Sequence, residues 1–252
     1  LKLNGNGAEE IVFKEEHLNP LEYTSINNKI YVTTTVFKGN KIKAHIYELE
    51  NDIWKKVSFD TDAMIIKLFE HNSKLYAFSY FEKYTEIKTF ENGTWKSLTI
   101  PQVKTFKMYE IHPVASVGGV IFVQIRSRVG GPMSKAKDEL YIMSEDGNIT
   151  SVFDYEKHGI KPVPVKTNLN KNPFEKPDNM VVGDMQVIPK IFKKGESVYY
   201  CFPTNGVYLE KNGDVKKSEE FNYVDTAILI GDKLYTGIPN MENGGLFYHT
   251  LK

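Results

Sequence analysis

Residues 63–79 read AMIIKLFEHNSKLYAFS, and residues 185–202 read MQVIPKIFKKGESVYYCF, so that the two segments align with one extra residue in the second. Each segment has an apolar run, a polar turn and a second apolar run that contains an aliphatic residue followed by tyrosine. Two apolar, aromatic-rich runs separated by a polar turn are typical of strands joined by a hairpin. The stretch therefore predicts a strand–turn–strand unit that occurs more than once in the chain.

An aliphatic residue followed by an aromatic one occurs five times, in most cases after a polar or glycine-containing turn. The pairs are Ile30-Tyr31, Leu75-Tyr76, Ile121-Phe122, Val198-Tyr199 and Leu234-Tyr235, so successive pairs lie 45, 46, 77 and 36 residues apart. In the first four units a second turn follows: Asn51-Asp52, Asn92-Gly93, Asp146-Gly147 and Asn212-Gly213. Asn-Gly and Asp-Gly favour two-residue hairpins because both central residues take positive φ. Three of the four intervals are close to the length of a four-stranded propeller repeat.

These repeats resemble β-propeller repeat proteins, and they are kelch-like in the turn-Leu-Tyr start and in the tryptophans, Trp54 and Trp95, that follow the second turn. They differ from kelch repeats because no double glycine follows the pairs. The resemblance covers nearly the whole chain. It implies an all-β fold, a β-propeller of five blades with four strands each, whose ring is closed by an N-terminal strand from within residues 1–13.

We expect residues 1–252 to form a single propeller domain, with a loop insertion at about 155–184 that accounts for the longest interval. Two separate antiparallel β domains are the alternative architecture. The recurring pairs are expected to open the innermost strands, and their aromatic rings to fill the space between neighbouring blades.

Composition limits the functions that the chain can have. The 252 residues include 32 Lys+Arg and 32 Asp+Glu, so the net charge is zero, which argues against a nucleic-acid partner. A single cysteine, Cys201, excludes a disulfide within the chain. The longest mostly apolar stretch, residues 114–125, is much shorter than a membrane span. The six histidines show no paired spacing typical of metal ligands, so neither a metal nor a cofactor is expected.

Only two of the 32 cationic residues are arginines, Arg126 and Arg128, and they lie two residues apart. The strand period of two places Gln124, Arg126 and Arg128 on one face. Two guanidinium groups there would hold a carboxylate, sulfate or phosphate through forked hydrogen bonds that lysine does not make. His112 is expected to reach the same mouth of the ring. The alternative is that arginine is rare in this lysine-rich chain and pairs with acidic neighbours such as Asp60 or Glu110.

Carboxylates from several blades could also meet in one pocket, as in five-bladed glycoside hydrolases, where an acid and a nucleophile or base flank the scissile bond. The candidates are Asp60, Asp62, Glu110 and Asp225. Solvated loop carboxylates are the preferred interpretation, since no spacing along the chain singles any of them out.

The sequence therefore favours a non-enzymatic binding or interaction module that holds its ligand at one mouth of the propeller, with Arg126, Arg128, Gln124 and His112 as the binding residues and no catalytic residue assigned. The ligand is expected to be an anionic small molecule, a glycan or a protein partner, and the chain to be a monomer. The alternative is a polysaccharide-acting enzyme, either a glycoside hydrolase or a lyase. A lysine- and asparagine-rich composition points to the exterior or surface of a bacterial cell, with a cytoplasmic location as the alternative.

Overall fold

The computed structural model describes residues 2–4, 7–9, 18–38, 41–59, 61–130, 135–161, 163–168, 179–185, 187–219, 221, 224, 226–238 and 245–250. The chain divides into two compact units. The first comprises residues 1–137 and 141–150, and the second comprises residues 138–140 and 151–252. That residues 1–252 form a single propeller domain therefore stays a prediction.

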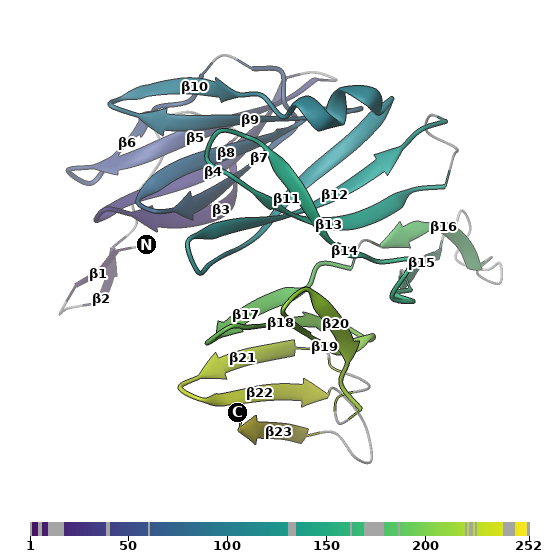
Figure 1. Cartoon of the computed structure of the whole chain (residues 1–252). Helices are drawn as coiled ribbons and strands as arrows, with labels where there is room; N and C mark the ends of the chain where they lie inside the picture. Colours follow the sequence, from purple (N-terminus) through teal and green to yellow (C-terminus); the bar gives the residue numbers. More distant parts are fainter. Residues whose placement is uncertain are drawn as a thin grey trace, which may run out of the picture. The chain divides into compact units, whose positions relative to one another are not determined.

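Five antiparallel sheets follow one another along the chain (Figure 1). The first has the order β3 (Leu18–Ile26), β4 (Lys29–Lys38), β5 (Lys41–Glu50) and β6 (Ile53–Lys56). The second has the order β7 (Ile65–His71), β8 (Lys74–Tyr80), β9 (Thr85–Glu91) and β10 (Thr94–Leu98). A short 3₁₀ helix, η1 (Pro101–Thr105), leads to the third sheet, of β11 (Met108–Val117), β12 (Val120–Arg128), β13 (Lys137–Met143) and β14 (Ile149–Asp154).

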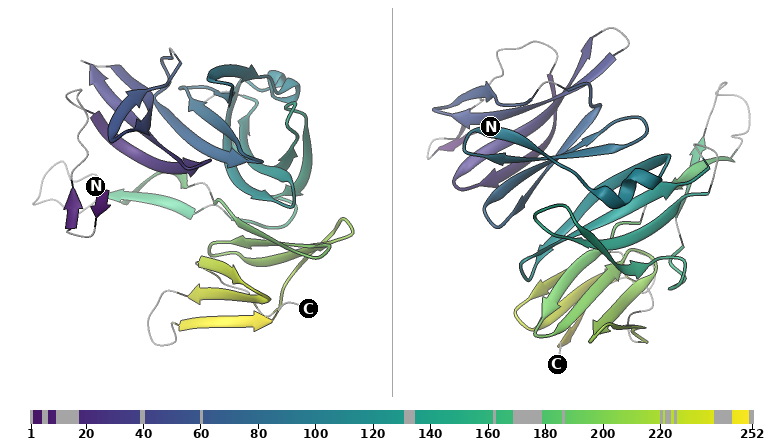
Figure 2. Two further views of the ribbon diagram at one scale, coloured as in Figure 1. Left: turned by 90° about the vertical axis from the view of Figure 1, so that its left-hand side faces the viewer. Right: turned by 45° about the horizontal axis from the view of Figure 1, so that its top comes forward.

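The last two sheets belong to the second unit. One has the order β17 (Lys190–Lys194), β18 (Ser197–Phe202), β19 (Gly206–Lys211) and β20 (Asp214–Lys217). The other has three strands, β21 (Thr226–Ile230), β22 (Lys233–Ile238) and β23 (Gly245–Thr250). Each sheet is an up-and-down meander, which is the connectivity of a propeller blade (Figure 2). The predicted all-β fold of five propeller-type blades is confirmed.

The recurring aliphatic-aromatic pairs lie in the second strand of each sheet, in β4, β8, β12, β18 and β22. The expectation that they open the innermost strands is therefore wrong, because an innermost strand is an edge strand and these strands have a hydrogen-bonded neighbour on both sides. Their position explains their composition. A strand that is paired on both edges and covered on both faces reads as a nearly continuous apolar run.

The predicted hairpin turns lie where the sequence placed them. Asn92 and Gly93 have φ values of 51° and 79°, and Asn212 and Gly213 have values of 55° and 81°, as a type I′ turn requires. Each turn connects the third and fourth strands of its sheet. The turn at Asp146-Gly147 differs, because among its two residues only Gly147 has a positive φ, of 88°.

Apolar clusters between successive sheets form the core of each unit. In the first unit, one cluster joins the β3–β6 and β7–β10 sheets and includes Tyr31, Ile46, Ile66 and Leu75. A second cluster joins the β7–β10 sheet to the third sheet and includes Tyr76, Phe78, Ile111, Ile121 and Met143. In the second unit, Tyr199, Val207, Ala227 and Leu234 join the β17–β20 and β21–β23 sheets. Three aromatic residues of the pairs, Tyr31, Tyr76 and Tyr199, thus lie between sheets as the sequence predicted, whereas the ring of Tyr235 lies 5.7 Å from that of Tyr248 on the neighbouring strand of its own sheet.

Two short hairpins lie outside the five sheets. β1 (Lys2–Asn4) pairs with β2 (Gly7–Glu9), and the rest of the expected closing strand, residues 10–13, lies outside the described residues. Closure of the ring by an N-terminal strand stays a prediction. The region expected to be a loop at 155–184 contains a hairpin of β15 (Val163–Asn168) and β16 (Asn179–Met185), so the loop interpretation was wrong for those residues. Pro164 interrupts the strand pattern of β15, whereas β16 contains no proline.

Replacing Tyr76 by alanine is expected to lower the free energy of unfolding by about 3–5 kcal/mol, the usual cost of truncating a buried aromatic side chain. Tyr76 is fully buried between the second and third sheets. Its hydroxyl has no hydrogen-bond partner among the described residues, so Tyr76→Phe, the matched control, should unfold at the same urea concentration or a higher one. Equal stability of the alanine variant and the wild type in urea unfolding would contradict this packing.

Gly147→Ala is expected to destabilise the fold more than Gly93→Ala, although both glycines have positive φ. A Cβ atom on Gly147 would lie 2.4 Å from the backbone oxygen of Thr99, whereas a Cβ atom on Gly93 would meet nothing within 4 Å. The free energies of unfolding of the two variants, obtained from thermal unfolding, should therefore differ by about 1–3 kcal/mol, since only the Gly147 substitution adds a steric clash with the backbone. Equal melting temperatures would rule out the close approach at Gly147.

Candidate functional site

The four predicted binding residues lie close together on two adjacent strands of the first unit. In the ladder between β11 and β12, His112 is opposite Gln124 and Glu110 is opposite Arg126. Residues directly opposite each other in an antiparallel pair project from the same face, so these four side chains share one face of the sheet. Arg128 follows two residues later on that face. Gln124 is fully buried, while Arg126 and Arg128 are half-buried.

His112 is held on both sides of its ring. The Tyr80 hydroxyl lies 3.1 Å from His112 Nδ1, and Glu110 Oε2 lies 3.2 Å from His112 Nε2. The Tyr80 and His112 rings lie 5.0 Å apart between centroids. The His112 side chain is 12% exposed and that of Glu110 is 53% exposed, so the series runs from the interior at Tyr80 to solvent at Glu110. A tyrosine, a histidine and a carboxylate are thus joined by two polar contacts.

The charges around this series act in opposite directions on its two ends. The hydrogen bond from His112 is the main cause that lowers the pKa of Glu110, and the positive charges of His112, Arg126 and Arg128 lower it further against the effect of burial. Burial raises the pKa of Tyr80 far above its usual range, and the negative charges of Glu110 and Glu22 add to that effect. At neutral pH the site therefore holds an ionised Glu110 and a protonated Tyr80.

A small hollow opens beside the two arginines. It has a volume of about 20 Å³ and is lined by Glu82, Lys83, Met108, Tyr109, Glu110, Arg126 and Arg128. That volume is enough for a water molecule or one small polar group, because a cavity of about 10–15 Å³ already holds a water. The hollow is thus suited to the end of one substituent of a larger ligand.

Backbone contacts fix β11 against the second sheet. The Tyr109 amide donates to the Lys83 carbonyl at 2.9 Å, and the Ile111 amide donates to the Thr85 hydroxyl at 3.0 Å. The strand pairing shifts register between Pro113 and Ala115, directly after His112. Bulges of this kind change the direction of neighbouring side chains and are frequent beside active sites. The position of His112 is therefore set by the backbone on both sides of it.

The sequence located part of this site and missed the rest. Glu110 was among the candidate carboxylates for glycoside hydrolysis and was also considered as an arginine partner, but it was not assigned as a site residue, and Tyr80 was not considered. The repeat pattern could have identified Tyr80, because it occupies the same repeat position as the predicted site residue Arg126. Each lies five residues after the aliphatic residue of its pair, Leu75 or Ile121.

Of the other acidic candidates, the structure describes Asp62, which does not join this cluster. Asp62 forms an ion pair with Lys43, with 2.7 Å between Nζ and Oδ1, and its side chain is 81% exposed. Asp60 and Asp225 lie outside the described residues. Within the part of the chain that the structure describes, no group of three or more His, Cys, Asp or Glu side chains is arranged to hold a metal ion. No helix among those residues is long and apolar enough to cross a membrane.

No protein-family model matches the sequence, and no curated protein matches it. Among solved structures, the chain is similar to an endo-arabinase from Bacteroides thetaiotaomicron, with a TM-score of 0.44, 10% identity and coverage of 97% of this chain and 98% of that chain. It is also similar to an α-L-arabinofuranosidase from Lactobacillus brevis, with a TM-score of 0.42, 10% identity and coverage of 92% and 90%. An acylaminoacyl peptidase from Pyrococcus horikoshii has a TM-score of 0.49 and 10% identity, and the match covers 93% of this chain but 38% of that one.

The two glycoside hydrolases that match over most of their length contradict the prediction of a non-enzymatic binding module, and they favour the alternative of a polysaccharide-acting enzyme. Because identity is so low, no residue of this chain takes a role from these neighbours. The kelch resemblance finds no matching family model either. The likeness concerns the propeller-type all-β fold.

Glu110→Gln is expected to destabilise the fold at about pH 7 and to have little effect at about pH 3. Folding lowers the pKa of Glu110, so its charge stabilises the folded state above the unfolded-state pKa. That stabilisation disappears as the pH falls through the lower folded-state pKa. Urea unfolding of the wild type and of Glu110→Gln at the two pH values measures the effect. A stability difference between them that does not change with pH would show that the Glu110 charge makes no net contribution.

Proposed function

We propose that this chain is an enzyme that cleaves glycosidic bonds in an acidic polysaccharide. The observation that supports the proposal is the series Tyr80–His112–Glu110, joined by contacts of 3.1 and 3.2 Å, beside Arg126 and Arg128 on one face of the third sheet. A histidine oriented by a carboxylate on one nitrogen and facing a hydroxyl on the other is an arrangement suited to general acid–base catalysis.

In this proposal His112 is the proton-transfer group and Glu110 is its positioning residue. The pKa of Tyr80 is raised so far that the phenol does not lose its proton by itself near neutral pH. Tyr80 therefore passes a proton to the glycosidic oxygen while it takes another from Nδ1 of the doubly protonated His112 ring. The bond between the anomeric carbon and that oxygen breaks, and the leaving sugar departs with the proton from Tyr80. Water adds to the anomeric carbon, and the proton that it releases returns to His112 Nδ1, which restores the pair.

Arg126 and Arg128 would bind the substrate, whereas Gln124, which the sequence also predicted to bind, is fully buried. A carboxylate oxygen of a uronic acid residue fits the hollow of about 20 Å³ beside both guanidinium groups. The forked donors of arginine recognise a planar carboxylate through two parallel hydrogen bonds, which explains why arginine is used here in a chain otherwise rich in lysine. A polysaccharide substrate is in keeping with a location outside the cell, which we propose with it.

Activity is tested on a panel of acidic and neutral polysaccharides by measuring new reducing ends. The wild type is expected to cleave an acidic member, and Tyr80→Phe and His112→Gln should each lower kcat by roughly 10²–10⁴-fold, the usual contribution of general acid–base catalysis. Arg126→Lys keeps the charge but loses the fork, so it should mainly raise KM.

Unchanged urea unfolding of each variant controls for folding. Absence of activity on every polysaccharide, or full activity in His112→Gln, would overturn the proposal. Release of unsaturated uronate products, seen as new ultraviolet absorbance, would show elimination in place of hydrolysis and would exclude the attack by water.

A further inference from the structure

A second hollow lies between the first and second sheets of the first unit, at the opposite end of β8 from Tyr80. It has a volume of about 580 Å³, within the usual range of ligand pockets. Leu75 lines it, and Leu75 and Tyr80 are five residues apart on β8, which corresponds to about 17 Å along the strand. This turn-end pocket is therefore separate from the His112 site.

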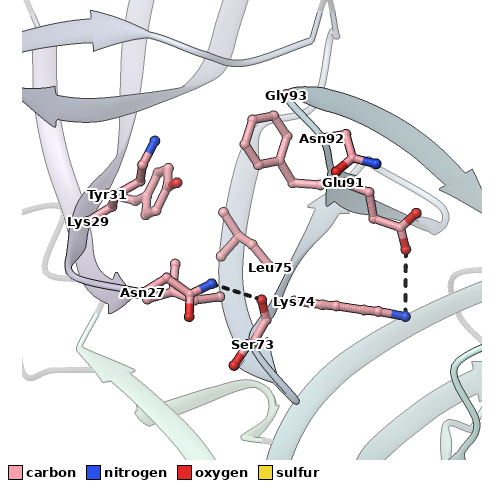
Figure 3. A pocket seen from close by; sticks show the side chains of 11 residues that line it. Asn27, Lys29, Tyr31, Ser73, Lys74, Leu75, Glu91, Asn92 and Gly93 are labelled. Atoms are coloured by element: carbon pink, nitrogen blue, oxygen red, sulfur yellow. Dashed lines mark hydrogen bonds and ion pairs between the residues drawn. The ribbon is translucent and has the colours of Figure 1, made fainter.

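Apolar side chains form the floor and polar groups form the rim of the turn-end pocket. Ile26, Tyr31 and Leu75 are buried, and Phe90 is half-buried. Figure 3 shows Lys29 and Tyr31 on one side and Glu91, Asn92 and Gly93 on the other, all from hairpin ends. An apolar floor with a few convergent polar groups is the usual composition of a site for a small organic ligand.

The rim is rigid, because its turns are connected to one another. The Asn27 side-chain amide donates to the Ser73 carbonyl at 3.1 Å, which joins the turn of the first sheet to that of the second. Asn27, Ser73 and Asn92 all have positive φ, between 49° and 60°, as tight two-residue turns require. A rim that is fixed before a ligand arrives costs less entropy on binding.

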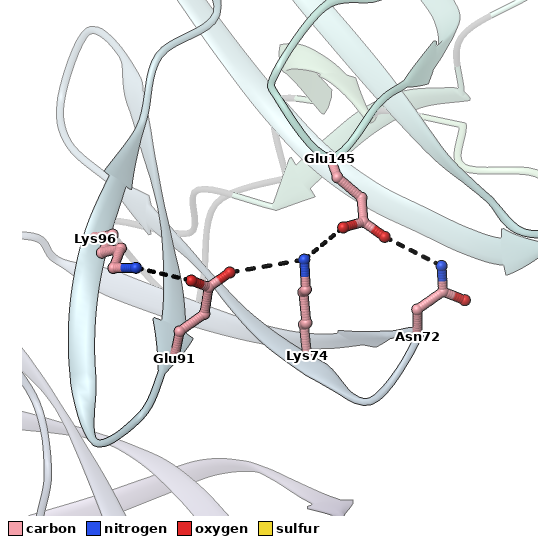
Figure 4. Close-up of polar contacts among 5 residues, drawn as sticks. All are labelled: Asn72, Lys74, Glu91, Lys96 and Glu145. Carbon is pink, nitrogen blue, oxygen red and sulfur yellow. Dashed lines mark hydrogen bonds and ion pairs between the residues drawn. The ribbon is translucent and has the colours of Figure 1, made fainter.

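The charged groups of the rim already have partners of opposite sign. Lys29 Nζ lies 2.5 Å from Glu48 Oε1. Figure 4 shows Lys74 between Glu91 and Glu145, with Nζ–O distances of 3.6 and 2.5 Å, and Lys96 lies 2.9 Å from Glu91. The Tyr31 hydroxyl is hydrogen-bonded to Glu48, and burial and this carboxylate raise the pKa of Tyr31 to about 12. A ligand that carried a net charge would have to compete with these pairs, so the electrostatics favour a neutral, polar ligand.

We infer that the turn-end pocket binds a neutral sugar unit. A sugar ring has apolar C–H faces that fit the floor of Tyr31, Phe90 and Leu75, and hydroxyl groups at its edge that fit the amides of Asn27 and Asn92. The volume accommodates one or two rings. The inference is independent of the proposed activity, since it concerns another hollow and binding without turnover.

Binding is measured by isothermal titration with cellobiose, lactose and maltose, and with digalacturonic acid as the charged probe. At least one neutral disaccharide is expected to bind the wild type and to bind Tyr80→Phe equally well. Asn92→Gly removes one rim amide and keeps the positive φ, so it should weaken that binding by roughly tenfold, the effect of losing about one hydrogen bond to a ligand.

The matched control is Asn212→Gly, which makes the same change in the Asn-Gly turn of the β17–β20 sheet, where Asn212 has a φ of 55° and does not line the pocket. It should leave the affinity unchanged. Should Asn92→Gly lower the melting temperature more than Asn212→Gly, Asn92→Asp provides a second test, because it keeps the size of the side chain and tolerates positive φ but removes the amide donor.

The inference is overturned if none of the three neutral disaccharides binds, or if Asn92→Gly and Asn212→Gly have the same effect. It is also overturned if digalacturonic acid binds the wild type and Arg126→Lys but does not bind Asn92→Gly, because the turn-end pocket would then hold a charged ligand. A loss of cleavage activity in Tyr80→Phe together with unchanged disaccharide binding would support both proposals separately.

Discussion

Apolar packing between neighbouring sheets is the interaction on which the rest of the structure depends. Each sheet has two faces, and the second strand of a sheet contributes side chains to both. In β8, Leu75 and Ala77 pack toward the first sheet, whereas Tyr76 and Phe78 pack toward the third. A single meander would leave one of these faces in water, so successive sheets stabilise one another.

Polar contacts between sheets then determine how the packed sheets are aligned. The Trp95 indole donates to the Val57 carbonyl at 2.7 Å, which joins the second sheet to the first. His71 Nδ1 lies 2.8 Å from the Ser116 hydroxyl, which joins the second sheet to the third, and His71 is almost fully buried. Buried polar groups that are paired in this way favour one alignment, because any shift would leave them without a partner.

Both proposed sites follow from that alignment. The His112 site needs Tyr80 from the second sheet beside Glu110 and His112 from the third. The turn-end pocket needs Tyr31 from the first sheet beside Leu75 from the second. Packing of the same strand, β8, thus positions residues at both of its ends. One set surrounds a proton-transfer series, and the other surrounds a hollow whose charged rim groups are paired.

The sequence by itself determined the strands, their hairpins and their number of repeats, because periodic apolar pairs and Asn-Gly turns are local signals. It also brought Gln124, Arg126 and Arg128 to one face, since the strand period of two requires it. It placed the pairs in the wrong strand of the sheet, because periodicity along a chain does not say which neighbours a strand pairs with. The strand β15 was not predicted because Pro164 interrupts its alternation, and β16 was not predicted because it follows the proline-containing segment with Pro173 and Pro177.

Only the tertiary structure decided that Tyr80 meets His112 and that Glu110 faces Arg126. These contacts join residues 32 and 16 positions apart, and they depend on strand register and on the stacking of two sheets. A register shift of one residue would turn each side chain to the other face, so a pattern of residue types cannot fix such contacts. The turn-end pocket could not be predicted from the sequence for the same reason, since its floor and rim come from four separate hairpin strands.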